Sequence, residues 1–72
     1  MNATAIRLRE QTGLTQFEVA QKTGVHPSLI SRLESGTGRP GTDGLLKLAH
    51  FYGASIEALL TDSNADEPSG NP

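Results

Sequence analysis

The sequence predicts an all-α fold, a compact bundle of five short helices. The chain has 72 residues, enough for one small domain. Glycines divide its first 60 residues into five intervals, with breaks at Gly13, Gly24, residues 36–41 and Gly53. In no interval do apolar and polar residues alternate with the period of two that is typical of a strand. A domain of this size buries only about 60% of its unfolded surface, and a helical bundle is the simplest way to build so small a core.

The first two helices are predicted at residues 4–12 and 16–23. The first opens with Thr4 and has short apolar or small side chains on one face. This face consists of Ala5, Leu8 and Thr12. In the second helix, Thr15 followed three residues later by Glu18 has the spacing of a capping box, which predicts a helix start. Its apolar face consists of Val19 and Ala20.

The remaining helices are predicted at residues 27–34, 42–52 and 56–60. Pro27 suits a first helical turn, because the N–H that it lacks would be unpaired there. Gly53 is a left-handed stop for the fourth helix, and Ser55 caps the fifth. The apolar stripes are Leu29, Ile30 and Leu33, then Leu45, Leu48, Ala49 and Tyr52, then Ile56, Leu59 and Leu60.

Composition restricts the class of protein and the kinds of site. The chain has no cysteine and only two histidines, so we expect no disulfide, no metal site and no cofactor. It has no apolar run of about 20 residues and no signal-peptide pattern, which predicts a soluble cytoplasmic protein without a membrane segment. Residues 61–72 are polar and contain two prolines, so we expect a disordered tail after a domain of residues 1–60.

The stretch GTGRPG, residues 36–41, matches the glycine pattern of a dinucleotide-binding turn. That turn requires a preceding strand within a βαβ unit, whereas here a predicted helix precedes the glycines. The pattern therefore does not indicate a nucleotide site. We interpret the stretch as the loop that leaves the third helix.

Residues 15–33, TQFEVAQKTGVHPSLISRL, predict two short helices joined by a tight turn. Ala20 is small where the helices cross, Gly24 can adopt a positive φ in the turn, and Ile30 fills the angle between the helices. A larger side chain at residue 20 or a β-branched one at residue 24 would separate the pair. Together these residues predict a helix-turn-helix.

With the flanking motifs, residues 5–60 resemble the lambda-repressor-like helix-turn-helix domain of the Xre or Cro type. The matching stretches are LREQTGLTQFEVAQKTGV, ISRLESG, GRPGTDGLLKLAHFYG and SIEALL. The resemblance implies five helices, with the third in the DNA major groove, and a homodimer on a palindromic operator. Three residues depart from the family pattern: Ala5 replaces a larger aliphatic residue, Phe17 a polar residue and His26 a Ser or Thr cap.

The resemblance also implies roles for individual side chains. Pro27, Ser28, Ser31 and Arg32 match the base-reading face of the third helix, and an arginine there can form two hydrogen bonds with a guanine. The amide of Gln16 is expected at a phosphate, where the start of the second helix favours an anion in any case. His26 either contacts a phosphate or is a weak cap. Arg39 and the loop glycines approach a phosphate, unless the loop is a plain connector. Arg9 and Glu34 match a buried ion pair.

These features predict a sequence-specific DNA-binding transcriptional regulator of phage or bacterial type. The alternative is a protein-binding module on the same fold, an antitoxin or adaptor, which the net charge of -2 leaves open. An enzyme is not expected, because no nucleophile or second carboxylate accompanies Glu34. The residues that could form an exposed apolar patch are Phe17, Phe51, Leu59 and Leu60. With so little apolar surface, we expect a monomer or weak dimer that pairs on double-stranded DNA.

Overall fold

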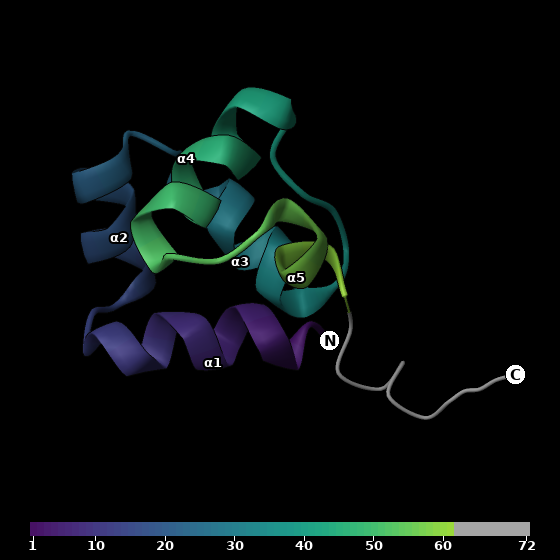
Figure 1. Ribbon diagram of the computed structural model, residues 1–72. Helices are drawn as coiled ribbons and strands as arrows, with labels where there is room; N and C mark the ends of the chain where they lie inside the picture. Colours follow the sequence, from purple (N-terminus) through teal and green to yellow (C-terminus); the bar gives the residue numbers. More distant parts are fainter. Residues whose placement is uncertain (62–72) are drawn as a thin grey trace, which may run out of the picture.

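The computed structural model describes residues 1–61, in which five helices form one bundle without any strand (Figure 1). The helices are α1 (Ala3–Thr12), α2 (Gln16–Thr23), α3 (Pro27–Ser35), α4 (Thr42–Tyr52) and α5 (Ile56–Leu60). The prediction of an all-α fold with five helices is confirmed, and the helix limits differ by no more than one residue from those predicted. The predicted polar tail lies outside the described residues, apart from Thr61.

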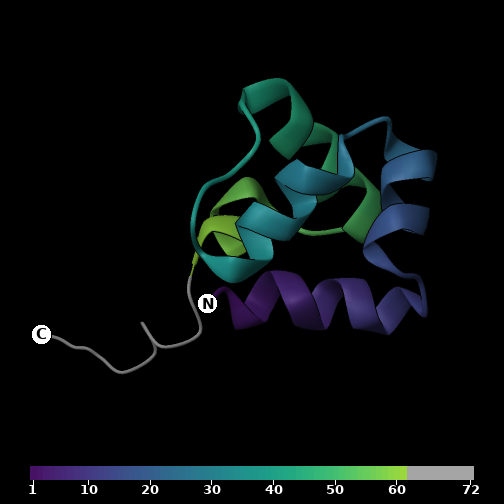
Figure 2. The ribbon, with the colours of Figure 1, turned by 180° about the vertical axis from the view of Figure 1, so that it is seen from behind.

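α1 lies along one side of the bundle, and the other helices cover its opposite side (Figures 1 and 2). α2 stands at the C-terminal end of α1, whereas α5 lies near its N-terminal end and contacts both α1 and α4. α4 is in front of α3 in Figure 1 and behind it in Figure 2, so one long side of α3 is at the surface. This arrangement exposes α3 between the loops that precede and follow it.

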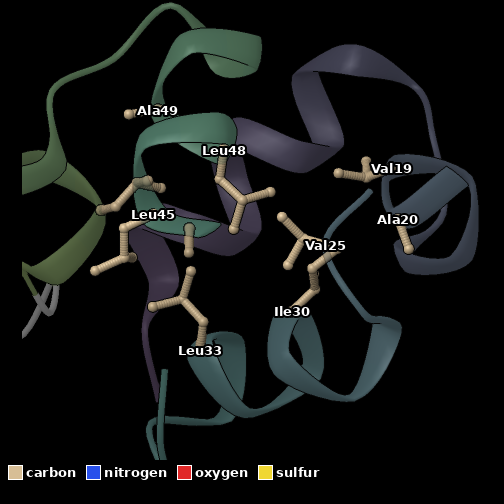
Figure 3. Close-up of a cluster of buried hydrophobic side chains, with 10 residues drawn as sticks. Val19, Ala20, Val25, Ile30, Leu33, Leu45, Leu48 and Ala49 are labelled. Atoms are coloured by element: carbon tan, nitrogen blue, oxygen red, sulfur yellow. The ribbon is translucent and has the colours of Figure 1, made fainter. Parts of the chain in front are cut away.

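The core is formed by one apolar cluster to which all five helices contribute. In Figure 3, Leu48 of α4 points toward Val25 and Ile30, with Leu33 on the adjoining turn of α3. Ile30, Leu48 and Leu59 are among the largest side chains that are fully buried, and each such burial contributes about 1.5–3 kcal/mol. The expectation of an exposed Leu59 is therefore wrong, because this residue faces α1 and α4 from the short α5.

The first helix begins at Ala3, one residue earlier than predicted, and Asn2 is its N-cap. The Asn2 Oδ1 accepts a hydrogen bond from the Ala5 N–H at 3.1 Å. In addition, the Asn2 Nδ2 donates to the Leu59 carbonyl, and its backbone N–H donates to the Glu34 carbonyl at 2.8 Å. Asn2 is itself buried and joins the starts of the chain and of α1 to both α3 and α5.

The prediction that Thr12 belongs to the apolar face of α1 is also wrong. Thr12 is exposed, and its hydroxyl donates to the Arg9 carbonyl and accepts from the Leu14 N–H at 3.2 Å. The half-buried Leu14, after the left-handed Gly13, packs against the core in its place. The hydroxyl of the last residue of α1 thus forms hydrogen bonds of the turn. The helical spacing of residues, on which the prediction was based, does not indicate such a role.

Candidate nucleic-acid interface

α2 and α3 form a helix-turn-helix around a small buried contact. Ala20 and Ile30 are both buried, and Val25 of the turn lies in the same cluster (Figure 3). Gly24 has a φ of 80° and its N–H donates to the Ala20 carbonyl at 2.8 Å. A β-carbon on Gly24 would meet nothing within 4 Å, so a β-branched residue is disfavoured there by the backbone conformation and not by a contact of its β-carbon. Positive φ, and not lack of space, is what favours glycine in this turn.

The start of α2 has a complete capping box. The Thr15 hydroxyl accepts from the Glu18 N–H at 3.1 Å, and the Glu18 carboxylate accepts from the Thr15 N–H at 2.9 Å. The N–H groups of Gln16 and Phe17 lie in the first turn, where no preceding turn can accept from them. Phe17 itself is 60% exposed at this end of the helix. The first turn of α2 therefore presents both backbone donors and an aromatic ring to the exterior.

The start of α3 is capped by the imidazole of His26. Its Nδ1 accepts a hydrogen bond from the Ser28 N–H at 3.1 Å and lies 2.8 Å from the Ser28 hydroxyl. Pro27 occupies the first helical position, where no backbone donor is needed. The ring nitrogen of His26 thus takes the place of the serine or threonine oxygen as the cap of α3.

The outward side of α3 is polar and free of acidic groups. Ser28, Ser31 and Arg32 are exposed and Pro27 is half-buried, whereas Ile30, Leu33 and Glu34 on the other side are buried. Arg32 has no ion-pair partner among residues 1–61. One side of α3 thus carries a single guanidinium that is not ion-paired within the described residues. The side chains around it are short, so another macromolecule can approach the helix closely.

The GTGRPG loop supports this side of α3 through its glycines. Gly36 ends α3 with a φ of 80°, and a β-carbon there would lie 3.1 Å from the backbone nitrogen of Met1. A β-carbon on Gly38 would lie 3.5 Å from both Cβ and Cδ of Arg32, so the loop backbone borders the stem of this side chain. Arg39 is exposed on the same loop. Close backbone packing therefore favours glycine at residue 36, whereas residues 38 and 41 have room for a β-carbon.

Beneath the helix-turn-helix, Arg9 and Glu34 form an ion pair between α1 and α3. Arg9 Nε is 2.7 Å from Glu34 Oε2, and Nη2 is 3.1 Å from Oε1. Arg9 Nη1 also donates to the Leu14 carbonyl at 3.0 Å. Because Glu34 is only 4% exposed and has these fixed donors, its carboxylate serves packing and is not placed for chemistry on a substrate. The hydrogen bond to Glu34 raises the pKa of the Arg9 guanidinium, although burial opposes this.

The same carboxylate binds the Gln16 amide and acts electrostatically on the Tyr52 phenol. Gln16 Nε2 donates to Glu34 Oε1 at 3.0 Å, so the amide expected at a phosphate is turned inward. Burial raises the pKa of the Tyr52 phenol to about 12, and the negative charge of Glu34 adds to this effect. The first residue of α2 is thus linked to the buried ion pair, a coupling that the sequence pattern did not indicate.

The described residues form neither a metal-binding cluster nor a membrane-spanning helix. Within residues 1–61, no three His, Asp or Glu side chains lie together in a way that could hold a metal ion. None of the helices in this part of the chain is both long and apolar enough to cross a membrane.

Comparisons with known proteins agree with this geometry. Residues 4–61 match the family model described as a helix-turn-helix domain. The chain is 42% identical over 62 residues to the cryptic phage CTXphi transcriptional repressor RstR of Vibrio cholerae, a match that covers 83% of this chain and 56% of that protein. It is 38% identical over 52 residues to the HTH-type transcriptional regulator ImmR of Bacillus subtilis (strain 168), covering 72% of this chain and 41% of ImmR.

A third relative is matched over more of its length. It is the uncharacterized HTH-type transcriptional regulator y4dJ of Sinorhizobium fredii, 38% identical over 58 residues, which cover 81% of this chain and 75% of y4dJ. The chain spans about half the length of the first two relatives. No solved structure matches it. The family match and these relatives confirm the resemblance to the Xre type, and the chain belongs to the helix-turn-helix domain family.

Proposed function

We propose that this chain is a sequence-specific DNA-binding transcriptional regulator, without enzymatic activity, in which α3 reads the major groove. The observation that carries the proposal is the exposed side of α3, where Arg32 lies among small polar side chains and has no ion-pair partner within residues 1–61. A major groove about 12 Å wide admits one helix, and short side chains allow that helix to lie close to the base edges. The names of two relatives, a transcriptional repressor and a transcriptional regulator, support the same function. Such a regulator would act in the cytoplasm.

In this proposal the residues of α3 divide into base readers and positioning groups. Arg32 donates two hydrogen bonds to a guanine, whose O6 and N7 both face the major groove. Ser28 and Ser31 contact neighbouring base edges, and Pro27 brings the first turn of α3 close to the DNA backbone. His26 stays committed to the cap of α3 through Nδ1, so only the other ring nitrogen is available to a phosphate.

Phosphate contacts come from the two segments that flank α3. At the start of α2, the free backbone N–H groups hold a phosphate. The side-chain amide of Gln16 has only its second hydrogen left for this contact, because the first is donated to Glu34. Arg39 and the glycine N–H groups of the following loop hold a second phosphate. Such contacts fix the position of the helix without reading sequence. Residues 1–60 form the DNA-binding domain, and their six basic and five acidic groups leave a net charge of +1.

A single recognition helix reads only a few base pairs, so we propose that two copies bind one palindromic operator. Their half-sites lie about 10 base pairs apart, which places both copies of α3 on one side of the duplex. The free chain is a monomer or weak dimer and pairs on DNA. Duplexes with half-sites moved apart by about five base pairs, half a helical turn, should lose cooperative binding. Equal binding to both spacings, or one copy for each site by light scattering, would contradict the dimer.

The proposed function is tested by selection of bound sequences from a random duplex pool, followed by titration of the selected duplex. Arg32→Ala should lower the specific affinity by about 1–3 kcal/mol and relax the preference at one base pair. Arg39→Ala is the matched control, because loss of a phosphate contact weakens all sequences about equally. An unchanged affinity and site for Arg32→Ala would refute the role of α3. Binding that ignores salt would instead favour the protein-binding alternative.

A further inference from the structure

A second surface lies away from the exposed side of α3, between the end of α2 and the outer face of α4. It is a groove of about 360 Å³ lined by Lys22 of α2 and by Asp43, Leu46, Lys47, His50 and Phe51 of α4. α4 lies in front of α3 in Figure 1 and behind it in Figure 2, so its outer face is turned away from α3. A molecule in this groove would leave the proposed DNA-reading side uncovered.

The centre of the groove is apolar although it faces water. Leu46 is 53% exposed, and Phe51 is half-buried beside it. Leu46 and His50 are four residues apart on α4, as are Lys47 and Phe51, so these four side chains are neighbours on one face of the helix. Leu45, Leu48 and Ala49 supply the buried side of α4, and Phe51 also packs against the core, whereas Leu46 does not. The packing of the core therefore does not account for the exposed Leu46 at the centre of the groove.

The rim of the groove is basic. Lys22 and Lys47 stand on opposite walls, with His50 at the end of α4. The one acidic residue of the rim, Asp43, lies 3.7 Å from Lys47, at the long limit of an ion pair between exposed groups. A group that enters the groove thus meets apolar surface in the middle and positive charge at the edges.

Two occupants from this chain fit poorly. In a symmetric dimer built on the groove, the two patches together would bring four lysines and only two carboxylates into one interface. Residues 62–72 are acidic but contain no aliphatic side chain larger than that of alanine, apart from prolines, to cover Leu46. The occupant must therefore bring both carboxylates and large apolar side chains.

We propose that the groove is a docking site for an acidic amphipathic helix of another protein. Both walls are helices whose backbone groups are already paired, so an extended guest would find no backbone partners there. A helix satisfies its own backbone and needs only side-chain contacts, with apolar residues at intervals of three and four. A small molecule is less suited, because ligand sites bury most of the ligand, whereas Leu46 stands open to water. This inference goes beyond the proposed DNA binding and does not depend on it.

The test is a titration of the isotope-labelled full chain with two peptides, followed by NMR. Both peptides are helices of about 15 residues with the same Leu and Phe stripe, flanked by Glu in one peptide and by Lys in the other. We expect the Glu peptide to shift the resonances of residues 22, 46, 47, 50 and 51, with an affinity at least tenfold above that of the Lys peptide. No binding of the Glu peptide at about 1 mM, or equal affinities, would overturn the proposal.

Variants separate the groove from other exposed apolar surface. Leu46→Gln and Lys22→Gln should each weaken the Glu peptide several-fold, while their thermal unfolding stays unchanged because both side chains are exposed. Phe17→Gln is the matched control, since Phe17 is equally exposed on α2 but outside the groove, and should bind as the unaltered chain does. Loss of binding in the control alone would place the site elsewhere.

Two measurements without peptide test the other occupants. Shifts of the groove resonances with protein concentration would show a second copy, and shifts in a chain with Asp62→Asn, Asp66→Asn and Glu67→Gln would show its own C-terminal residues. Either result would overturn the proposal.

Discussion

Replacing Arg9 by alanine should leave the Glu34 carboxylate buried with one side-chain donor, the amide of Gln16. In the intact protein the carboxylate accepts from Arg9 Nε at 2.7 Å and from Nη2 at 3.1 Å, while its side chain is 6% exposed. Removing these donors leaves a buried charge without its partner, so Arg9→Ala should destabilise the fold by about 3–5 kcal/mol. A domain of this size has a total stability of only about 3–9 kcal/mol, so most of it would be lost.

Glu34→Ala should also destabilise the fold, by less than Arg9→Ala but still within about 3–5 kcal/mol. Glu34→Ala leaves the Arg9 guanidinium with its bond to the Leu14 carbonyl and with a side chain that is 18% exposed, so part of its charge reaches water. Adding Glu34→Gln to Arg9→Ala should recover about 1–3 kcal/mol, because it removes the stranded charge and keeps an acceptor for Gln16. Urea unfolding followed by circular dichroism measures all four chains. If Arg9→Ala stays within about 1 kcal/mol of the unaltered chain, or if the double change is the less stable, the assignment of a buried charge is refuted.

Three further predictions concern the caps and the buried phenol. Asn2→Ala should cost roughly 2–3 kcal/mol in urea unfolding, because it removes the cap of α1 and leaves the Leu59 carbonyl unpaired; a loss below about 0.5 kcal/mol would contradict those contacts. His26→Ala should cost about 0.5–2 kcal/mol and His26→Ser almost nothing, since serine restores a capping oxygen; equal melting temperatures for the two would exclude capping by the ring. The pKa of Tyr52, raised to about 12, is above the ordinary value of about 10, so stability should fall as pH rises through this window. Tyr52→Phe should flatten that fall, and an equally steep loss in both chains would refute the burial of the phenol.

The coupling of Gln16 to Glu34 bears on how the interface is held. The ion pair fixes α1 against α3, and the Gln16 amide attaches the first turn of α2 to the same carboxylate. The buried Glu34 carboxylate therefore helps to position both α3 and the first turn of α2, the two segments that we propose contact DNA. For this reason Gln16→Ala should affect stability as well as DNA affinity, whereas a side chain directed only at a phosphate would affect affinity alone.

The sequence by itself determined the fold class, the helix limits and the position of the helix-turn-helix. These features depend on groups close together in the chain. The Thr15–Glu18 capping box, the glycines that end helices with positive φ, and the spacing of apolar residues on α3 and α4 act over one or two turns. Such hydrogen bonds and steric limits involve residues that are close together in the chain and do not depend on how the helices pack. They can therefore be predicted without the tertiary structure.

Only the tertiary structure decided which side chains share a partner across the bundle. The bond from Asn2 to Leu59 spans 57 positions, and the bonds from Gln16 and Arg9 to Glu34 depend on how α1, α2 and α3 cross. In a helix as short as α5, periodicity does not distinguish the buried Leu59 from the exposed Leu60. Contacts of this kind are set by the crossing of helices and the space between them, and neither quantity is encoded in the spacing of residues along a single segment.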